Sequence, residues 1–259
     1  MKQKFNLHTH TWRCGHAIGE DSEYIENAIV AGFDCLGFSE HIQYRADRGK
    51  YDRIDFEDFK KYFSEINNLK KNYESQIRIL CGLEAAYVPE AMQDLLDLRK
   101  YCDFVLLGQH QGGLNDRKYS LSCNDEELIC YAKEVERGIQ TGLYNILAHP
   151  DYFMCARSDW NDKCNESAYR ICQVAKKARI PLELNIKGSY SLAEDIAGRK
   201  RIKYPYRKFW EIAADVGNEV LYGWDAHSPQ EMFRTTEKVD EITKDLNLNM
   251  IEEIESYII

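Results

Sequence analysis

The stretch FNLHTH, residues 5–10, is a short apolar run that ends in two histidines one residue apart. In an extended strand this spacing directs His8 and His10 to the same side. Similar apolar runs that end in histidine or a carboxylate recur along the chain. They are DCLGFSEH at 34–41, IRILCGLE at 77–84, DFVLLGQH at 103–110, NILAHP at 145–150 and EVLYGWDAH at 219–227.

Helical patterns separate these runs, and this alternation predicts βα units around a parallel sheet. We expect strands at about 4–8, 34–39, 77–83, 103–108, 145–148, 181–185 and 219–223. We expect helices at about 22–31, 56–73, after 89, at 125–141, 166–178 and 205–216, and from 229 to the C-terminus, with a polar loop at 188–203. The first helix should be capped by Asp21 or Ser22. Seven such units predict one α/β domain, residues 1–259, closed into a distorted barrel whose chemistry lies at the C-terminal ends of the strands.

Composition and charge restrict the function classes. The chain has 259 residues, 44% hydrophobic and 30% charged, with no apolar run of membrane-spanning length and no signal-peptide core at its start. We therefore expect a cytoplasmic protein without a membrane partner. The net charge of -9 argues against a nucleic-acid partner, yet it is compatible with a small phosphorylated substrate if divalent cations line the pocket. The sequence does not specify an oligomeric state.

All seven histidines of the chain lie just past predicted strands, so they should meet at one end of the barrel. A single buried histidine is more often a core residue than a ligand, but the whole set favours a metal cluster. Glu84 after a buried run needs a cation, either a metal or an arginine. Asp225 is a ligand candidate or a helix cap. Cys14, one of nine cysteines, is expected to be a bystander thiol rather than a ligand.

Several of these segments together, in this order, resemble the PHP superfamily of polymerase-associated and histidinol-phosphatase domains, and most closely its histidinol phosphatases. They are HTHTWRCGHA at 8–17, SEH at 39–41, GLE at 82–84, GQH at 108–110, AHPD at 148–151, LELNIKG at 182–188, YPYRKFWEIAADVG at 204–217 and DAHSP at 225–229. Each motif is degenerate, but the ordered set spans nearly the whole chain.

The resemblance implies a (β/α)7 barrel that holds three metals, and two to three divalent transition metals (zinc, manganese or iron) as cofactors. The first would be held by His8, His10, Glu84 and Asp225. Glu84 would bridge to a second, completed by His110 and His149. His16, His41 and His227 would hold the third. The chain departs from the family at Glu40, where an aspartate is common.

The resemblance also implies a metal-dependent phosphomonoesterase that hydrolyses L-histidinol phosphate to L-histidinol and phosphate by attack of a metal-bridging hydroxide. One alternative is another phosphoester, such as a phosphotyrosine protein, a sugar phosphate or a nucleotide. A different class is a noncatalytic metal-binding protein with the same barrel.

The residues that contact the substrate are predicted less directly. His227 or Asp151 would protonate the leaving group; the alternative for Asp151 is that it orients a ligand histidine. Arg157 would grip the phosphate; the alternative is a surface arginine near Asp159. The weaker candidates for substrate contact are Asn185, Lys187, Arg199 and Arg201. Tyr190, Tyr204 and Trp160 either line a pocket or simply pack. An arginine that related phosphatases carry soon after the strand-six asparagine and glycine is missing, because Ser189 and Tyr190 follow Gly188.

Overall fold

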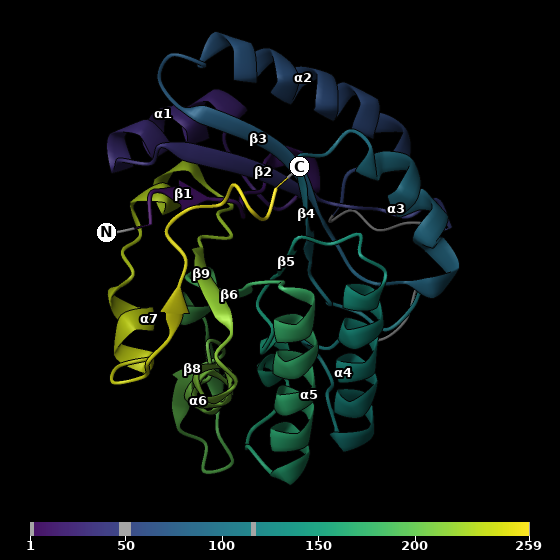
Figure 1. Ribbon diagram of the computed structural model, residues 1–259, viewed down its shortest axis with the longest axis vertical. Coiled ribbons are helices and arrows are strands. Elements are labelled where there is room, and N and C mark those ends of the chain that lie inside the picture. The colour runs from purple at the N-terminus through teal and green to yellow at the C-terminus, as the bar shows by residue number, and fades with distance from the viewer. Residues whose placement is uncertain (1–2, 47–52, 115–117, 259) are drawn as a thin grey trace.

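The computed structural model describes residues 3–46, 53–114 and 118–258. Its main sheet has eight strands in the order β1-β2-β3-β4-β5-β6-β9-β10, paired in parallel throughout. The strands are β1 (Phe5–Asn6), β2 (Cys35–His41), β3 (Arg78–Ala85), β4 (Phe104–Leu107), β5 (Ile146–Leu147), β6 (Leu182–Asn185), β9 (Glu219–Gly223) and β10 (Asn249–Met250). A parallel bridge between Thr9 and Ala226 joins the chain past β1 to the chain past β9, so the sheet curls round on itself (Figure 1). The predicted distorted α/β barrel is confirmed.

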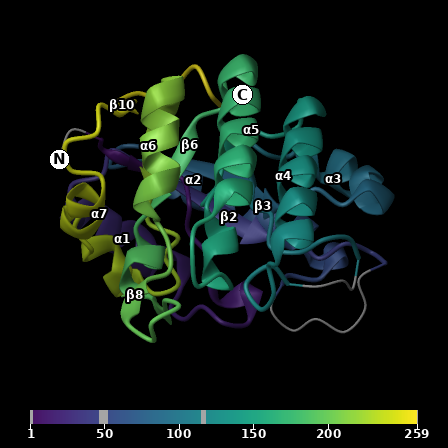
Figure 2. The ribbon, with the colours of Figure 1, turned by 90° about the horizontal axis from the view of Figure 1, so that it is seen from below.

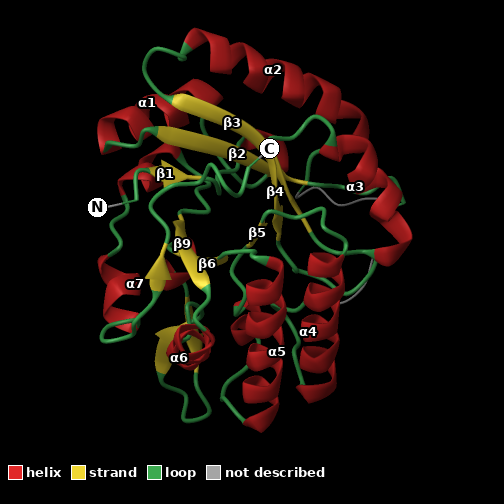
Figure 3. Cartoon of the chain, viewed as in Figure 1, coloured by secondary structure: helices red, strands yellow, loops and turns green. Residues whose placement is uncertain are grey.

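The helices lie outside the curled sheet, as Figure 3 shows by colour. They are α1 (Asp21–Ala31), α2 (Phe59–Asn72), α3 (Met92–Arg99), α4 (Asp125–Gln140), α5 (Asp162–Ala178), α6 (Arg207–Val216) and α7 (Glu237–Ile242). Figure 2 shows α4, α5 and α6 side by side along one flank of the barrel. Each βα unit therefore buries one apolar stripe of its helix against the sheet. No helix in the described ranges is long and apolar enough to cross a membrane.

Two apolar clusters fill the molecule on either side of the sheet. The larger one lies between sheet and helices and includes Tyr62, Leu95 and Trp210. The smaller one lies inside the curl and contains Phe104 at the start of β4, together with Ile254 from the C-terminal segment. This interior cluster includes the first residues of three strands, Phe5, Cys35 and Phe104, whereas the ligand candidates lie at or past the C-terminal ends.

The expected polar loop at 188–203 contains a short antiparallel hairpin, β7 (Leu192–Glu194) and β8 (Lys200–Ile202). The turn between these strands is fixed by Asp195, whose carboxylate accepts hydrogen bonds from the backbone N–H of Ala197 and Arg199. The turn depends on one polar side chain, so the segment has the composition of a loop although its two arms form an antiparallel strand pair.

Two helix boundaries and the C-terminus also differ from expectation. α1 is capped reciprocally by Glu20 and Glu23 rather than by Asp21 or Ser22. α5 begins four residues before the expected start because Asn161 accepts a hydrogen bond from the backbone of Cys164. The helices expected up to the C-terminus end at Ile242, and the chain then adds β10 beside β9.

Candidate metal centre

The ends of the parallel strands bring the predicted ligands together. Glu84 in β3 lies opposite His41 in β2 in the sheet register. His8 and His10 flank Thr9, which bridges to Ala226, and this places them beside Asp225. His149 and Asp225 adopt left-handed backbone conformations, with φ of 29° and 48°. Such conformations are costly for residues other than glycine and are concentrated at functional sites.

The first predicted ligand set forms a compact cage of four atoms. The Nε2 atoms of His8 and His10 are 3.1 Å apart, and they lie 3.2 and 3.3 Å from Oε2 of Glu84. Oδ1 of Asp225 lies 3.6 and 3.4 Å from the same two nitrogens. Tetrahedral ligands at metal-ligand bonds of about 2.0–2.1 Å are about 3.3–3.4 Å apart. The cage therefore has the size of a four-coordinate transition-metal site.

The other carboxylate oxygen of Glu84 faces the second predicted set. Its Oε1 lies 2.8 Å from Nε2 of His149 and 3.4 Å from Nε2 of His110. The two oxygens of Glu84 thus point into two neighbouring groups of imidazoles. This is the geometry that a bridging carboxylate requires.

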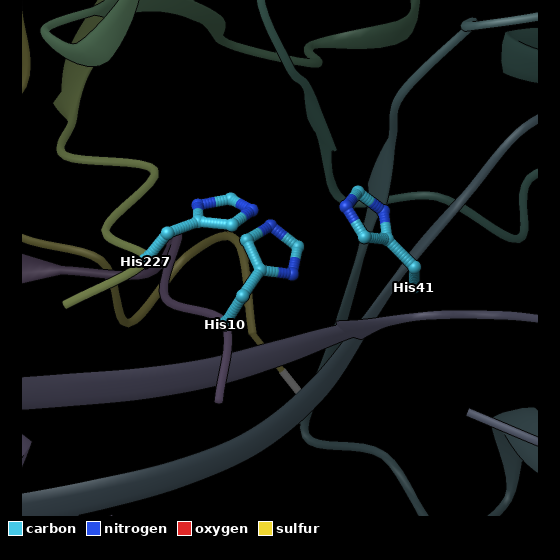
Figure 4. A group of neighbouring side chains, drawn as sticks. All are labelled: His10, His41 and His227. Atoms are coloured by element: carbon cyan, nitrogen blue, oxygen red, sulfur yellow. The ribbon is translucent and has the colours of Figure 1, made fainter. Parts of the chain in front are cut away.

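The third predicted set is only partly brought together. The Nε2 atoms of His16 and His227 lie 2.9 Å apart, while their Nδ1 atoms face the backbone carbonyls of Cys14 and Asp225 at 3.0 and 2.9 Å. A carbonyl can only accept, so Nδ1 of His16 carries the proton and its Nε2 lone pair faces Nε2 of His227. His41 instead groups with His10 and His227, as Figure 4 shows, and its Nδ1 lies 2.9 Å from Glu84.

Cys14 lies at the edge of this third set. Its buried Sγ is 3.9 Å from Nε2 of His16 and groups with His16 and His227. Burial raises the pKa of the thiol to about 12. That it is a bystander stays a prediction.

The pKa values of the buried carboxylates and imidazoles favour a bound cation at this site. Burial would raise the pKa of Glu84, but the surrounding imidazoles, His110 first, hold it well below its usual value. Burial lowers the pKa of His227 to about 2, so this imidazole is neutral and has a free lone pair. For His8, burial is outweighed by Glu183, Asp225 and Glu84, and its pKa is raised well above the usual value. The carboxylates at this position therefore require positive charge, from a proton or a metal.

Buried ligand atoms that lie close together without a hydrogen bond between them show whether these residues fit a metal ion. Oε2 of Glu84 and Nδ1 of His41 are buried, 2.9 Å apart, and neither has a hydrogen-bond partner among the described residues. Buried polar atoms without partners cost about 1–3 kcal/mol each. A cation between them removes that cost, so the donor set fits a divalent transition metal.

One further carboxylate, outside the predicted ligand sets, orients a ligand histidine: Oε2 of Glu183 in β6 lies 2.6 Å from Nδ1 of His8. Glu40 in β2 lies 4.0 Å from Nδ1 of His10, which is beyond hydrogen-bond distance. Glu40 is fixed by the backbone N–H and the hydroxyl of Thr11. A carboxylate on the far nitrogen fixes the tautomer and raises the basicity of a ligand histidine. The prediction missed Glu183, because a glutamate in PLELN has the alternation of an ordinary strand.

Two glycines make room for the carboxylates of Glu84 and Glu183. A Cβ at Gly108 would collide with the carboxylate of Glu84, and a Cβ at Gly223 would collide with that of Glu183. Glycine at these two strand ends therefore permits the close approach of a bulky charged group.

The ligand cluster forms the floor of a cavity of about 340 Å³, within the range of small-molecule sites. Its wall is rich in cations and hydroxyl groups. The lining includes Arg53, Lys118, Ser120, Tyr152, Cys155, Lys187, Ser191, Lys203 and Tyr204. The Lys187 ammonium lies 2.9 Å from Nδ1 of His227 and 3.4 Å from Oδ1 of Asp225, and it is the one predicted substrate-contact cation found on this wall. Of the three aromatic residues predicted either to line a pocket or to pack, Tyr204 lines the cavity. Trp160 stacks on Tyr206, and the ring of Tyr190 packs against Lys238.

The three arginines predicted to contact phosphate lie elsewhere. Arg157 donates to the carbonyl of Cys123 and to Asp125, in a separate surface hollow beside the start of α4. Arg199 pairs with Asp195 in the hairpin turn and is largely exposed. Arg201 donates to backbone carbonyls, including that of Met154. Each guanidinium is engaged outside the cavity, so these assignments are corrected.

The predicted roles of Asp151 and Asn185 also change. Asp151 is fully buried, and its Oδ2 accepts from the backbone of Tyr206 and the indole of Trp210, which anchors the start of α6. Burial raises its pKa to about 6, but the carboxyl does not line the cavity. Asn185 donates to Glu183 and Asp225 at 2.7 and 3.2 Å. It therefore holds the carboxylates rather than facing a substrate.

Comparison with known proteins agrees with this geometry. A family model described as "PHP domain" matches residues 6–187. The chain is 25% identical over 248 residues to a protein of Deinococcus radiodurans named "Probable histidinol-phosphatase", covering 91% of each chain. It is 25% identical over 253 residues to a protein of the same name in Schizosaccharomyces pombe, covering 87% of this chain and 81% of that one.

Among solved structures, the histidinol phosphate phosphatase of Lactococcus lactis, complexed with zinc, L-histidinol and phosphate, superposes with a TM-score of 0.71. The identity is 19%, and the match covers 96% of this chain and 95% of that one. The fold is thus shared over nearly the full length of both proteins. Since the family model also covers more than half of the chain, this protein belongs to the PHP domain family.

Proposed function

We propose that this protein is a metal-dependent phosphomonoesterase that hydrolyses L-histidinol phosphate to L-histidinol and phosphate. The observation that carries the proposal is the four-atom cage of His8, His10, Glu84 and Asp225 at the floor of a cavity walled by lysines. A cage of metal-binding size below a positively charged wall is what a dianionic phosphate ester requires.

The ligand assignment follows from the groups described above. His8, His10, Glu84 and Asp225 would hold one ion. Glu84, His110 and His149 would hold a second, since both imidazoles face Oε1 of Glu84. His16 and His227 would hold a third, with His41 between the groups. Zinc, manganese and iron all suit imidazole and carboxylate donors, and two to three ions fit the number of groups.

The chain's own residues have three tasks in this chemistry. Divalent ions of this kind, when bound, acidify a water and neutralise the charge of the phosphate oxygens. Glu183 keeps the imidazole of His8 oriented. Lys187 is placed to donate to a phosphate oxygen from the wall above Asp225. Tyr152 and Tyr204, 5.5 Å apart edge to face, form an aromatic part of the cavity wall against which a substrate can pack.

The substrate is supported by similarity. Two full-length relatives carry the name histidinol-phosphatase, and the Lactococcus lactis structure contains L-histidinol and phosphate. The cavity volume of about 340 Å³ suits a small phosphorylated metabolite better than a phosphotyrosine on a protein.

Phosphate release from a panel of esters tests the proposal. The metal-loaded protein should release phosphate from L-histidinol phosphate at least about tenfold faster than from phosphotyrosine or sugar phosphates, a difference of about 1.4 kcal/mol. A preference for another ester would remove the histidinol phosphate assignment. No release from any ester, with metal bound, would favour a metal-binding protein without catalysis.

A further inference from the structure

The cation that completes the phosphate site can be identified by comparing the positive side chains around the cavity. Arg157, Arg199 and Arg201 are all engaged outside it. Lys187 is on the wall, but its ammonium already lies against Asp225 and His227. Arg53 and Lys118 also line the cavity, and both already have interaction partners. A monoester phosphate carries about two negative charges near neutral pH, so one further donor on the wall would be used.

Lys203 meets the requirements for this further phosphate donor, because it lines the cavity and its ammonium has no ion-pair partner among the described residues. It follows β8 directly, lines the same cavity as Glu84 and Asp225, and is partly exposed. Within residues 3–46, 53–114 and 118–258, no oxygen atom pairs with its ammonium. The charge of Lys203 opposes the rise that burial causes in the pKa of the Cys155 thiol, so the ammonium lies near this second residue of the cavity lining.

The backbone around Lys203 is held firmly, so the side chain starts from a fixed point. Its N–H donates to the carbonyl of Ser191 at 3.0 Å, and its own carbonyl accepts from Arg201 at 3.0 Å. Arg201 is anchored in turn on the carbonyl of Met154 at 2.7 Å. The arginine thus braces the hairpin that presents the lysine, and does not itself reach the substrate.

We propose that Lys203, directly after the hairpin β7–β8, binds a nonbridging oxygen of the substrate phosphate. The inference rests on the proposed function for its substrate, but its probe is inorganic phosphate. A charge-assisted hydrogen bond of this kind contributes about 1.5–3 kcal/mol. Loss of Lys203 should therefore weaken phosphate binding by about tenfold to a hundredfold.

Calorimetric titration of inorganic phosphate into the metal-loaded full chain tests this, with L-histidinol titrated in parallel. Lys203→Ala should weaken phosphate binding about tenfold or more and leave L-histidinol binding unchanged, and Lys203→Arg should recover part of the affinity. Lys200→Ala is the matched control, because Lys200 is exposed on the same hairpin outside the cavity lining. It should bind phosphate as the unaltered protein does.

Equal phosphate affinity in Lys203→Ala and the unaltered protein would overturn the inference, as would loss of L-histidinol binding alone. Metal content measured on the same samples should be equal in all variants, which excludes an indirect effect through the ligands. A protein that binds phosphate through Lys203 but hydrolyses no ester would contradict the proposed function and leave this inference standing.

Discussion

Replacing Glu183 by glutamine tests whether the carboxylate behind His8 tunes the metal site. Glu183 and His8 are both 1% exposed, and Oε2 lies 2.6 Å from Nδ1. Glutamine keeps the size but removes the charge, and its amide cannot accept from both His8 and Asn185 as the carboxylate does. Loss of such a partner typically lowers metal affinity or activity by about 10–100-fold, or about 1.4–2.7 kcal/mol.

The assay is competition for zinc against a chelator of known affinity, with phosphate release measured on the same samples. Because Glu183 is the leading group that raises the pKa of His8 against burial, NMR titration of the metal-free variant should show that pKa lowered. Glu194→Gln, an exposed change on β7, is the control. Unchanged zinc affinity and an unchanged pKa of His8 in a folded Glu183→Gln protein would refute the reasoning.

Three further substitutions test other parts of the site. Glu84→Gln should reduce bound metal by at least one ion per chain and abolish turnover, because one carboxylate faces both imidazole groups, whereas the remote Glu237→Gln should change neither. Gly108→Ala should also lower metal content in elemental analysis, since the new Cβ would collide with the Glu84 carboxylate. Arg157→Ala should leave kcat/KM within about threefold of the unaltered value, because its guanidinium binds the carbonyl of Cys123 and Asp125 outside the cavity. A loss of about a hundredfold, the scale of a charge-assisted contact, would show that Arg157 does contact the phosphate.

Much of the barrel could be predicted because its signals are local. An apolar run such as FVLL shortly before a histidine predicts both a buried strand and the polar residue at its C-terminal end. Parallel strands then bring these C-terminal ends to one face of the barrel. His8, His10, Glu84 and Asp225 meet because this rule holds for each of their strands separately. The boundaries that were wrong depend on caps and turns formed by single side chains, as at Asn161 and Asp195.

The surroundings of the ligands depend on contacts between distant segments and were less predictable. Arg157 is eight positions past His149, but the chain turns back toward α4 and carries it away from the cavity. Lys203 is far from any ligand in the sequence, and only the hairpin brings it to the wall. Glu183 alternates with Leu182 and Leu184 as in an ordinary strand, so the sequence did not signal that it is buried. Its partner lies 175 positions away.

The most direct test of the metal centre is a titration of the metal-free protein with zinc, with the initial rate of phosphate release from L-histidinol phosphate measured at each addition. The ligand groups around Glu84 predict a rate near zero without metal, which rises with bound zinc and saturates at two to three ions per chain. An undiminished rate in metal-free protein held in strong chelator would contradict the assignment of these residues as a catalytic metal centre.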